Sequence, residues 1–470
     1  MRLLARLPGL FRDLPRLRRS PLFLPDWYAG TYPDIGGYDP ARHYLAHGAA
    51  EGRDPGPEFS TSGYGLQGAF DGNPLLHYQE RGRSAGRAAL PSLAGTGPQG
   101  APKVLFAAHQ APARAFGAER SLLDMLDRAH AAGLTAEVVA PQMLSPGYLR
   151  DLQARAARVH LIPYGWRRAG VDTHPATIAA LSALIRQSGA VELHQNTLAV
   201  EAPLIAARAA GIPSTLWLRE IPDQDPDLCA RIGMDPDTIR TGILDQADRF
   251  IANSAETARW IDPRGDLGAR LLTVPNMVDQ GLFDLEFAPP PRIRVGLVGS
   301  LIAKKGIADF IAVARAFQGS GGEAEFLLIG PHGTDLEALS PLPPGIRHAG
   351  YAENPARAMA QIDLLLSLSH FAESFGRTVL EAMAAGRPVI CYDRGAPPRI
   401  LGDAGRKTPP DDPQAVARAL HDMLADPAGL GAFSAAGRVR ARDLLRDAGN
   451  SPSERIFPHA ISVASSSKLP

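Results

Sequence analysis

Short apolar runs alternate with longer amphipathic stretches over most of the chain. The stretches between the runs carry their apolar residues at helical spacing, whereas the runs themselves are short and rich in Val, Ile, Leu and Phe. This alternation predicts β-α-β units and therefore a doubly wound parallel sheet. The first series of predicted strands comprises residues 103–108, 136–140, 159–162, 190–194, 214–218 and 249–252.

Three consecutive prolines, Pro289 to Pro291, end this series, and a second one begins after them. We therefore predict two α/β domains of similar size, 103–288 and 292–448, separated by a proline hinge. Ligands of such sheets bind at the carboxyl ends of the strands, so a cleft between the domains is expected. The second series of predicted strands comprises residues 293–299, 325–329, 346–350, 363–367 and 388–391.

The segment 23–92 contains an internal repeat. The pattern Pro-x-x-His-Tyr-x-x-x-Gly-x-x-x-Gly-Arg begins at Pro40 and recurs 34 residues later at Pro74. Each unit predicts a short helix that Pro opens and Gly closes. One His per unit, His43 and His77, favours packing over metal binding, and two such small units are expected to pack on each other or on the next part of the chain.

Composition predicts the character of the two ends of the chain and of the segment before the first domain. Residues 1–22 form a basic tail, with six arginines against one aspartate in the first 20 positions and leucines at helical spacing, as in helices that lie on anionic membranes. The prolines within it favour a frayed tail equally well. Residues 91–102 predict a linker, and the polar end 451–470 predicts a loosely ordered tail.

Composition excludes several classes of protein. Lys and Arg together number 49, as do Asp and Glu, which argues against a nucleic-acid partner. The only cysteines, Cys229 and Cys391, are far apart, so neither a disulfide framework nor a zinc knuckle is predicted and a reducing, cytoplasmic setting is favoured. No apolar run reaches the length of a membrane span. Only five of the 49 basic residues are lysines, and Lys304 and Lys305 are adjacent.

That lysine pair lies in a turn that predicts a phosphate site. The strand 293–299 ends at Gly299, and Ser300 to Gly306 lead into the next helix. A glycine turn lets the backbone approach an anion, the helix offers free N–H groups, and a lysine adds charge. The alternative is an ordinary solvated turn.

A second constellation begins at Glu373 and ends at Glu381, with a turn at Gly376 and a helix after it. Carboxylates eight residues apart on one helix would be separated by about 12 Å, too far to act as an acid/base pair on one bond. We therefore expect them to hold two parts of an extended ligand, with the helix N-terminus between them. The Asp-x-Asp spacing of Asp223 and Asp225 is typical of metal sites, but its context favours a surface loop, and no metal site is predicted.

The E-x7-E segment, the glycine-lysine turn and the two-domain layout together resemble glycosyltransferase family 4, over about residues 103–445. The resemblance implies a GT-B fold, with a small helical repeat module in front that resembles the paired HY-x-x-x-G repeats found before some bacterial glycosyltransferases. It implies that Glu373 contacts the donor sugar, that Glu381 binds the ribose, and that Lys305 binds phosphate. His194 matches a histidine that faces the donor sugar, so the implied catalytic residues are His194, Glu373 and Lys305. The implied donor-binding residues are Gly117, Gly299, Ser300, Lys304, Lys305, Ser374, Phe375, Gly376, Thr378 and Glu381.

The same resemblance implies a retaining, metal-independent transferase that uses a UDP- or GDP-linked sugar and acts on a glycan or lipid-linked acceptor in bacterial surface polysaccharide synthesis. Peripheral contact with the inner face of an anionic membrane would fit the basic tail. The sequence departs from the family at Ser300, where many members have Arg, and Lys304 could supply the missing charge. Two alternatives stay open: a GT-B sugar-nucleotide epimerase or hydrolase, and a non-catalytic glycan- or partner-binding protein.

Overall fold

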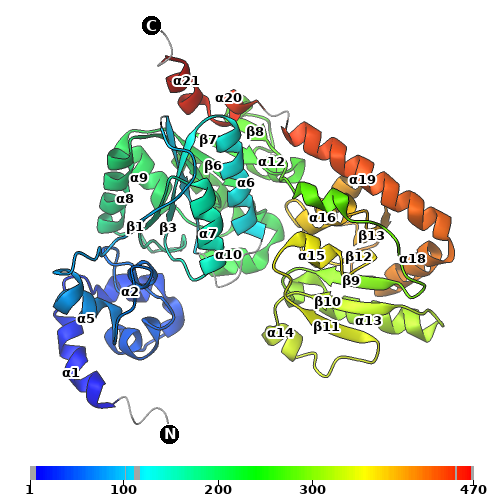
Figure 1. Ribbon diagram of the computed structural model, residues 1–470, viewed down its shortest axis with the longest axis horizontal. Helices are drawn as coiled ribbons and strands as arrows, with labels where there is room; N and C mark the ends of the chain where they lie inside the picture. Colours follow the sequence, from blue (N-terminus) through cyan, green and yellow to red (C-terminus); the bar gives the residue numbers. More distant parts are fainter. Residues whose placement is uncertain (1–6, 101, 111–116, 450–451, 467–470) are drawn as a thin grey trace.

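The computed structural model describes residues 7–100, 102–110, 117–449 and 452–466. Two parallel-sheet domains lie side by side, with a small helical module beside the first (Figure 1). The first sheet has the order β1-β4-β3-β2-β5-β6-β7-β8 and is parallel except for β1. Its strands are β1 (Ser92–Ala94), β2 (Lys103–Ala107), β3 (Thr135–Ala140), β4 (Arg158–Leu161), β5 (Ala190–Gln195), β6 (Ser214–Leu218), β7 (Arg249–Ala252) and β8 (Leu271–Thr273).

Helices cover both faces of this sheet, and two buried apolar clusters lie between them and the strands. The central strands are buried on both faces, which is why they read as nearly continuous apolar runs. The helices of this domain are α6 (Gly117–Ala131), α7 (Pro146–Arg155), α8 (Pro175–Ser188), α9 (Ala202–Ala210), α10 (Pro226–Ile232), α11 (Pro236–Gln246) and α12 (Ala255–Ile261).

The second sheet is entirely parallel, with the order β11-β10-β9-β12-β13-β14. Its strands are β9 (Arg294–Val298), β10 (Glu325–Ile329), β11 (Ile346–Gly350), β12 (Leu364–Ser367), β13 (Val389–Tyr392) and β14 (Arg406–Thr408). Its helices are α13 (Ile307–Gly319), α14 (Thr334–Glu337), α15 (Pro355–Met359), α16 (Arg377–Ala384), α17 (Pro397–Leu401), α18 (Pro413–Ala425) and α19 (Pro427–Gly449). Two doubly wound domains confirm the predicted architecture. The edge strands β8 and β14 were missed because three residues are too few to form a pattern.

The helical module contains two copies of the same local structure. In each repeat, a short helix begins at Pro and continues as a π turn to Gly: α3 (Pro40–His43) to Gly48, and α5 (Pro74–His77) to Gly82. The repeat histidines each contact a buried tyrosine that lies outside the repeated pattern: the Tyr28 hydroxyl is 2.9 Å from His43 Nδ1, and the Tyr64 hydroxyl is 2.6 Å from His77 Nδ1. These tyrosines come from α2 (Pro25–Thr31) and α4 (Thr61–Gly65).

The repeat glycines make room for these tyrosines. A Cβ atom on Gly48 would lie 2.0 Å from the Tyr28 hydroxyl, and one on Gly82 would lie 2.1 Å from the Tyr64 hydroxyl. The repeated His and Gly thus belong to one packing arrangement around a tyrosine from outside the pattern, and the prediction that the histidines serve packing agrees with these contacts.

The basic N-terminal segment is a helix of this module. α1 (Leu7–Arg18) packs against α3 and α5, with Leu17 completely buried. Arg16 pairs with Glu80, and Arg18 Nη2 lies 2.7 Å from Asp39 Oδ2. The alternative of a frayed tail is therefore wrong for these residues, while residues 1–6 lie outside the described part of the chain. Contact of α1 with a membrane stays a prediction.

Two other segments differ from their predicted state. Residues 92–94, read as linker, form β1, which pairs antiparallel with β4 at the edge of the first sheet. Within the predicted loose tail 451–470, the described residues form α20 (Ser453–Ile456) and α21 (Pro458–Ser466), with Phe457 between them completely buried against Phe106 and His194. After α19 the chain returns to the first domain (Figure 1). Composition did not predict this because the buried residues of the segment, Ile456, Phe457 and Ala460, are too few to form a continuous apolar run. None of the described helices combines the length and apolarity that a membrane span requires.

Candidate active site

A cleft of about 400 Å³ lies between the two domains. The first domain contributes the start of α6 and the carboxyl end of β6, and the second contributes the loops after β9 and β12 and the start of α16. Of the sequence-predicted site residues, those that line this cleft are Gly117, Gly299, Ser300, Lys304, Lys305, Glu373, Ser374, Phe375, Gly376, Thr378 and Glu381.

Glu373 and Lys305 form an ion pair in the second domain, with 2.8 Å between Lys305 Nζ and Glu373 Oε1. Ser369 also donates a hydrogen bond to this carboxylate. Burial raises the pKa of Glu373, but the charge of Lys305 and the hydrogen bonds outweigh it, so the pKa is lowered overall. Glu373 is therefore ionised at neutral pH, and Lys305 is fixed beside it with 29% of its side chain exposed.

The helix that follows offers its N-terminus to the same cleft. Gly376 is the N-cap of α16, with a φ of 84°, and no side chain among the described residues caps the helix. A Cβ atom there would approach Pro397 to 2.8 Å, so glycine is required by both conformation and space. The first helical residues, Arg377 and Thr378, line the cleft. Uncapped amides at a helix start favour an anion.

Glu381 lies one helical turn further along α16 and is only 4% exposed. Its Oε1 is 3.4 Å from Arg120 Nη1 of α6, a contact across the cleft. Burial raises the pKa of Glu381, and the charges of Arg120 and Arg377 oppose that shift only in part. The two carboxylates of the E-x7-E segment therefore differ, because Glu373 precedes the helix beside a lysine and Glu381 is inside it.

Lys304 points away from its neighbour. Its Nζ lies 2.8 Å and 3.0 Å from the two carboxylate oxygens of Asp225, across the cleft. The segment around Asp223 and Asp225 is largely exposed, in agreement with its interpretation as a surface loop, but Asp225 is half-buried, lines the cleft and caps α10. Asp223 instead accepts a hydrogen bond from Trp260 Nε1 at 2.6 Å.

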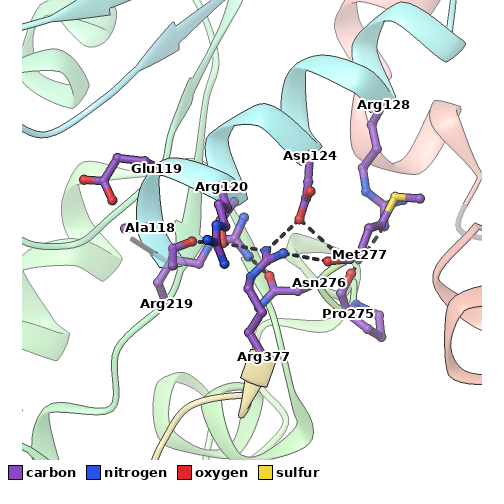
Figure 2. A network of polar contacts seen from close by, with 12 residues as sticks. Ala118, Glu119, Arg120, Asp124, Arg128, Arg219, Pro275, Asn276, Met277 and Arg377 are labelled. Carbon is purple, nitrogen blue, oxygen red and sulfur yellow. Dashed lines mark hydrogen bonds and ion pairs between the residues drawn. The ribbon is translucent and has the colours of Figure 1, made fainter. Parts of the chain in front are cut away.

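An arginine that the sequence did not single out joins the domains. Arg377 donates to Asp124 Oδ2 at 2.7 Å and to the carbonyl of Met277 at 2.6 Å (Figure 2). It also donates to Ser121 Oγ at 3.0 Å. Asp124 and Ser121 belong to α6, so Arg377 connects α16 with the first domain. The sequence showed this arginine only as part of the E-x7-E segment.

Arg219 was also missed, although it directly follows a predicted strand at the end where ligands bind. It donates to Asn276 Oδ1 at 2.5 Å and to Asn196 Oδ1 at 3.3 Å, and its guanidinium lies 5.0 Å from the Trp217 ring centre. Its carbonyl accepts a hydrogen bond from Ser374 Oγ at 2.6 Å. The rule that ligands lie at carboxyl ends of strands could have found it.

His194 does not lie at the cleft, and its predicted catalytic position is wrong. The side chain is completely buried, accepts a hydrogen bond from Trp217 Nε1 at 2.9 Å, and lies against Phe106 and Phe457. The returning α20–α21 segment covers it. Sequence position alone could not show this, because the covering residue comes from the far end of the chain.

Among the described residues, one group of side chains has the spacing of a metal site. One ligand atom each of Asp309, His370 and Asp411 lies within 4.8 Å of the others. Both carboxylates already have partners, since Tyr392 donates to Asp309 and Arg394 pairs with Asp411. These contacts are sufficient to explain why the two carboxylates lie close together.

Comparison with known proteins agrees with this geometry. Residues 292–426 match the family model described as glycosyl transferases group 1. A phosphatidyl-myo-inositol mannosyltransferase of Mycolicibacterium smegmatis is 28% identical over 327 residues, covering 66% of this chain and 81% of the relative. O-antigen chain mannosyltransferase B of Escherichia coli is 35% identical over 72 residues, covering 15% of this chain and 19% of the relative.

Solved structures share the fold at low identity. Anabaena HepE in complex with UDP-glucose superposes with a TM-score of 0.60 at 19% identity, over 74% of this chain and 97% of that one. WaaG, a glycosyltransferase involved in lipopolysaccharide biosynthesis, gives a TM-score of 0.56 at 14% identity, over 75% and 99%. The protein thus has the GT-B fold, and the matches support a glycosyltransferase of the group 1 type.

Proposed function

We propose that this protein is a retaining glycosyltransferase that moves a sugar from a nucleotide-sugar to a glycan or lipid-linked acceptor, without a metal ion. One observation carries the proposal: Lys305, Glu373, Glu381 and the uncapped start of α16 lie on one wall of the interdomain cleft. This is an arrangement of one cation, two carboxylates and free amides, suited to a ligand with a diphosphate between two hydroxyl-bearing sugars.

In this proposal each group has one task. Glu381 accepts hydrogen bonds from the ribose hydroxyls, and Glu373 accepts them from the donor sugar. Lys305 and the first amides of α16 stabilise the negative charge that grows on the diphosphate as the bond from the sugar C1 to the phosphate oxygen breaks. The acceptor oxygen forms the new bond to C1 on the same face, and its proton moves to the departing phosphate, so the anomeric configuration is retained.

The relatives named above indicate which class of donor and which class of acceptor to propose. The two curated relatives named above are mannosyltransferases, one acting on a phosphatidylinositol and one on an O-antigen chain, whereas the HepE complex contains UDP-glucose. We therefore propose a UDP- or GDP-linked hexose as donor and a cell-surface glycan or glycolipid precursor as acceptor. A cytoplasmic location stays a prediction.

The proposal is tested by substituting Glu381→Gln and measuring sugar transfer and thermal unfolding. Removing the ionised acceptor should lower transfer by about 100-fold or more, since hydrogen bonds to charged groups contribute roughly 1.5–3 kcal/mol and positioning adds to that. Burial raises the pKa of Glu381, which means that its surroundings destabilise the ionised carboxylate. A neutral amide of the same shape should therefore leave Tm nearly unchanged.

The matched control is Glu353→Gln, because the Glu353 side chain is 75% exposed on the same domain and pairs only with Arg357 among the described residues. It should leave both transfer and Tm unchanged. Full transfer activity in Glu381→Gln would contradict the site assignment. Conversion of the nucleotide-sugar without any acceptor, in a panel of UDP- and GDP-sugars, would instead favour an epimerase or hydrolase.

A further inference from the structure

Among the described residues, five cationic side chains line the cleft, and four of them are paired with carboxylates. Lys305 pairs with Glu373, Lys304 with Asp225, Arg377 with Asp124, and Arg120 with Glu381. Three of these pairs join the two domains. A ligand phosphate that approaches any of the four meets a carboxylate that already neutralises part of the charge.

The fifth cation, Arg219, has no such partner in the part of the chain that the structure describes. Within the described ranges, its guanidinium donates hydrogen bonds only to the neutral amide oxygens of Asn276 and Asn196. The neighbouring carboxylate of Glu220 faces elsewhere and accepts from the Thr197 hydroxyl and from the backbone N–H groups of Leu198 and Arg219.

The surroundings make this unpaired charge costly. Burial, and then the positive charge of Arg377, lower the pKa of Arg219 to about 9. A guanidinium stays protonated at neutral pH, so the shift measures how poorly the site stabilises the charge. An anion placed beside Arg219 would provide the favourable charge interaction that no carboxylate in the described part of the chain supplies there. The two asparagines and the Trp217 ring fix the guanidinium in place in advance.

The position of Arg219 points to one end of the ligand. Its backbone carbonyl accepts the hydrogen bond of Ser374, which directly follows Glu373, so Arg219 lies opposite the E-x7-E segment. Lys305 and α16 belong to the second domain, whereas Arg219 belongs to the first. A nucleotide held on the second domain would present its outer phosphate, the one bonded to the sugar, toward Arg219.

We propose that Arg219 binds the β-phosphate of the nucleotide-sugar from the first domain, opposite Lys305 on the second, so that each domain supplies one cation to the leaving group. This inference rests on the proposed function. A guanidinium fork matches two phosphate oxygens, which a point charge cannot do. Arg219 therefore couples closure of the cleft to the presence of the β-phosphate.

The test compares nucleoside diphosphate with nucleoside monophosphate binding by calorimetry, using UDP and UMP or GDP and GMP, whichever pair the wild-type protein binds. In Arg219→Gln the diphosphate affinity should fall by about tenfold or more, as for loss of a charge-assisted hydrogen bond. The monophosphate affinity should change by less than about threefold, which also shows that the variant is folded.

Two further variants complete the experiment. Arg219→Lys keeps the charge without the fork and should lie between the wild type and Arg219→Gln; it carries the test if the glutamine variant does not fold. Arg231→Gln is the matched control, because Arg231 also lies over an indole ring, 5.2 Å from the Trp166 centre, and does not line the cleft. It should bind both nucleotides as the wild type does.

Equal loss of mono- and diphosphate affinity in the Arg219 variants, or no loss of either, would overturn the inference while leaving the proposed function intact. Absence of nucleoside diphosphate binding in the wild-type protein would instead contradict the proposed function itself, and the inference with it.

Discussion

At the scale of single residues, the surroundings of a side chain decide its role more than its type does. Glu373 and Glu381 share a short segment, yet the pKa of Glu373 is lowered and that of Glu381 is raised, because only Glu373 has a lysine within 3 Å. The role of His194 is also decided by its surroundings. A histidine can act as an acid or base, but this one lies in the core, in contact with Trp217, Phe106 and Phe457 and with its Nε2 3.4 Å from Glu192 Oε1.

We expect His194→Ala to destabilise the protein without removing activity. The substitution leaves a cavity and an unsatisfied Trp217 N–H, so the free energy of unfolding should fall by about 3 kcal/mol or more. Transfer per folded molecule should stay within about threefold of the wild type, since a side chain outside the cleft does not contact substrate. Denaturant unfolding and initial-rate assays measure the two effects. The control, His130→Ala, removes an exposed histidine of α6 and should change neither.

A different result would restore the catalytic assignment of His194. That result is a loss of transfer of about 100-fold or more at unchanged Tm, the size expected for removal of a general acid or base.

At the scale of elements, the repeat module shows how a sequence motif arises from one packing arrangement. The Pro begins the helix, the His lies within hydrogen-bond distance of a tyrosine hydroxyl, and the Gly leaves space for that tyrosine. The final Arg lies on an aromatic ring, with Arg53 5.1 Å from the centre of Tyr32 and Arg87 5.3 Å from the centre of Tyr64. The Pro, the His, the first Gly and the Arg of the motif therefore each have a structural reason.

Gly48→Ala should destabilise the module, because its Cβ atom would lie 2.0 Å from the Tyr28 hydroxyl. We expect a loss of about 1–3 kcal/mol in unfolding free energy, the usual cost of overpacking. Combining it with Tyr28→Phe removes the hydroxyl and should recover part of that loss, which a double-mutant cycle in denaturant detects. Gly37→Ala is the control: no atom of the residues that the structure describes lies within 4 Å of its added Cβ, so it should be neutral or slightly stabilising. Simple additivity of Gly48→Ala and Tyr28→Phe would rule out the proposed clash.

At the scale of the whole molecule, charged contacts across the cleft hold the two domains together. Lys304 reaches Asp225, Arg377 reaches Asp124, and Arg399 Nε lies 2.6 Å from Glu256 Oε1. The chain itself adds a second connection, since α20 and α21 return to the first domain after α19 (Figure 1). We therefore expect these contacts to influence the relative position of the domains, and hence the width of the cleft.

We expect Lys304→Met to shift the nucleotide-free protein toward a more open arrangement. Small-angle scattering should show a larger radius of gyration, and saturating nucleoside diphosphate should reduce the difference, since a ligand shifts the population of domain states. Asp225→Asn should behave in the same way, and the exchanged pair Lys304→Asp with Asp225→Lys should recover the compact form. The unfolding free energy should change by about 1 kcal/mol at most, as for a partly exposed ion pair.

The control for this experiment is Asp245→Asn, which breaks the exposed pair of Arg208 and Asp245 within the first domain. It should leave the radius of gyration unchanged. An unchanged radius in Lys304→Met would show that the remaining contacts alone determine closure.

The sequence by itself determined the alternation of strands and helices, the two domains, the repeats, and the glycine-lysine turn and E-x7-E segment that form part of the cleft wall on the second domain. These features are local, because a buried parallel strand requires a continuous apolar run and a phosphate turn requires glycine and lysine at close spacing. Only the tertiary structure decided that His194 is buried, that Lys304 pairs with Asp225, that Arg219 and Arg377 face the cleft, and that the C-terminal segment covers the first domain. Each of these depends on residues far apart in the chain, whose contacts leave no periodic pattern.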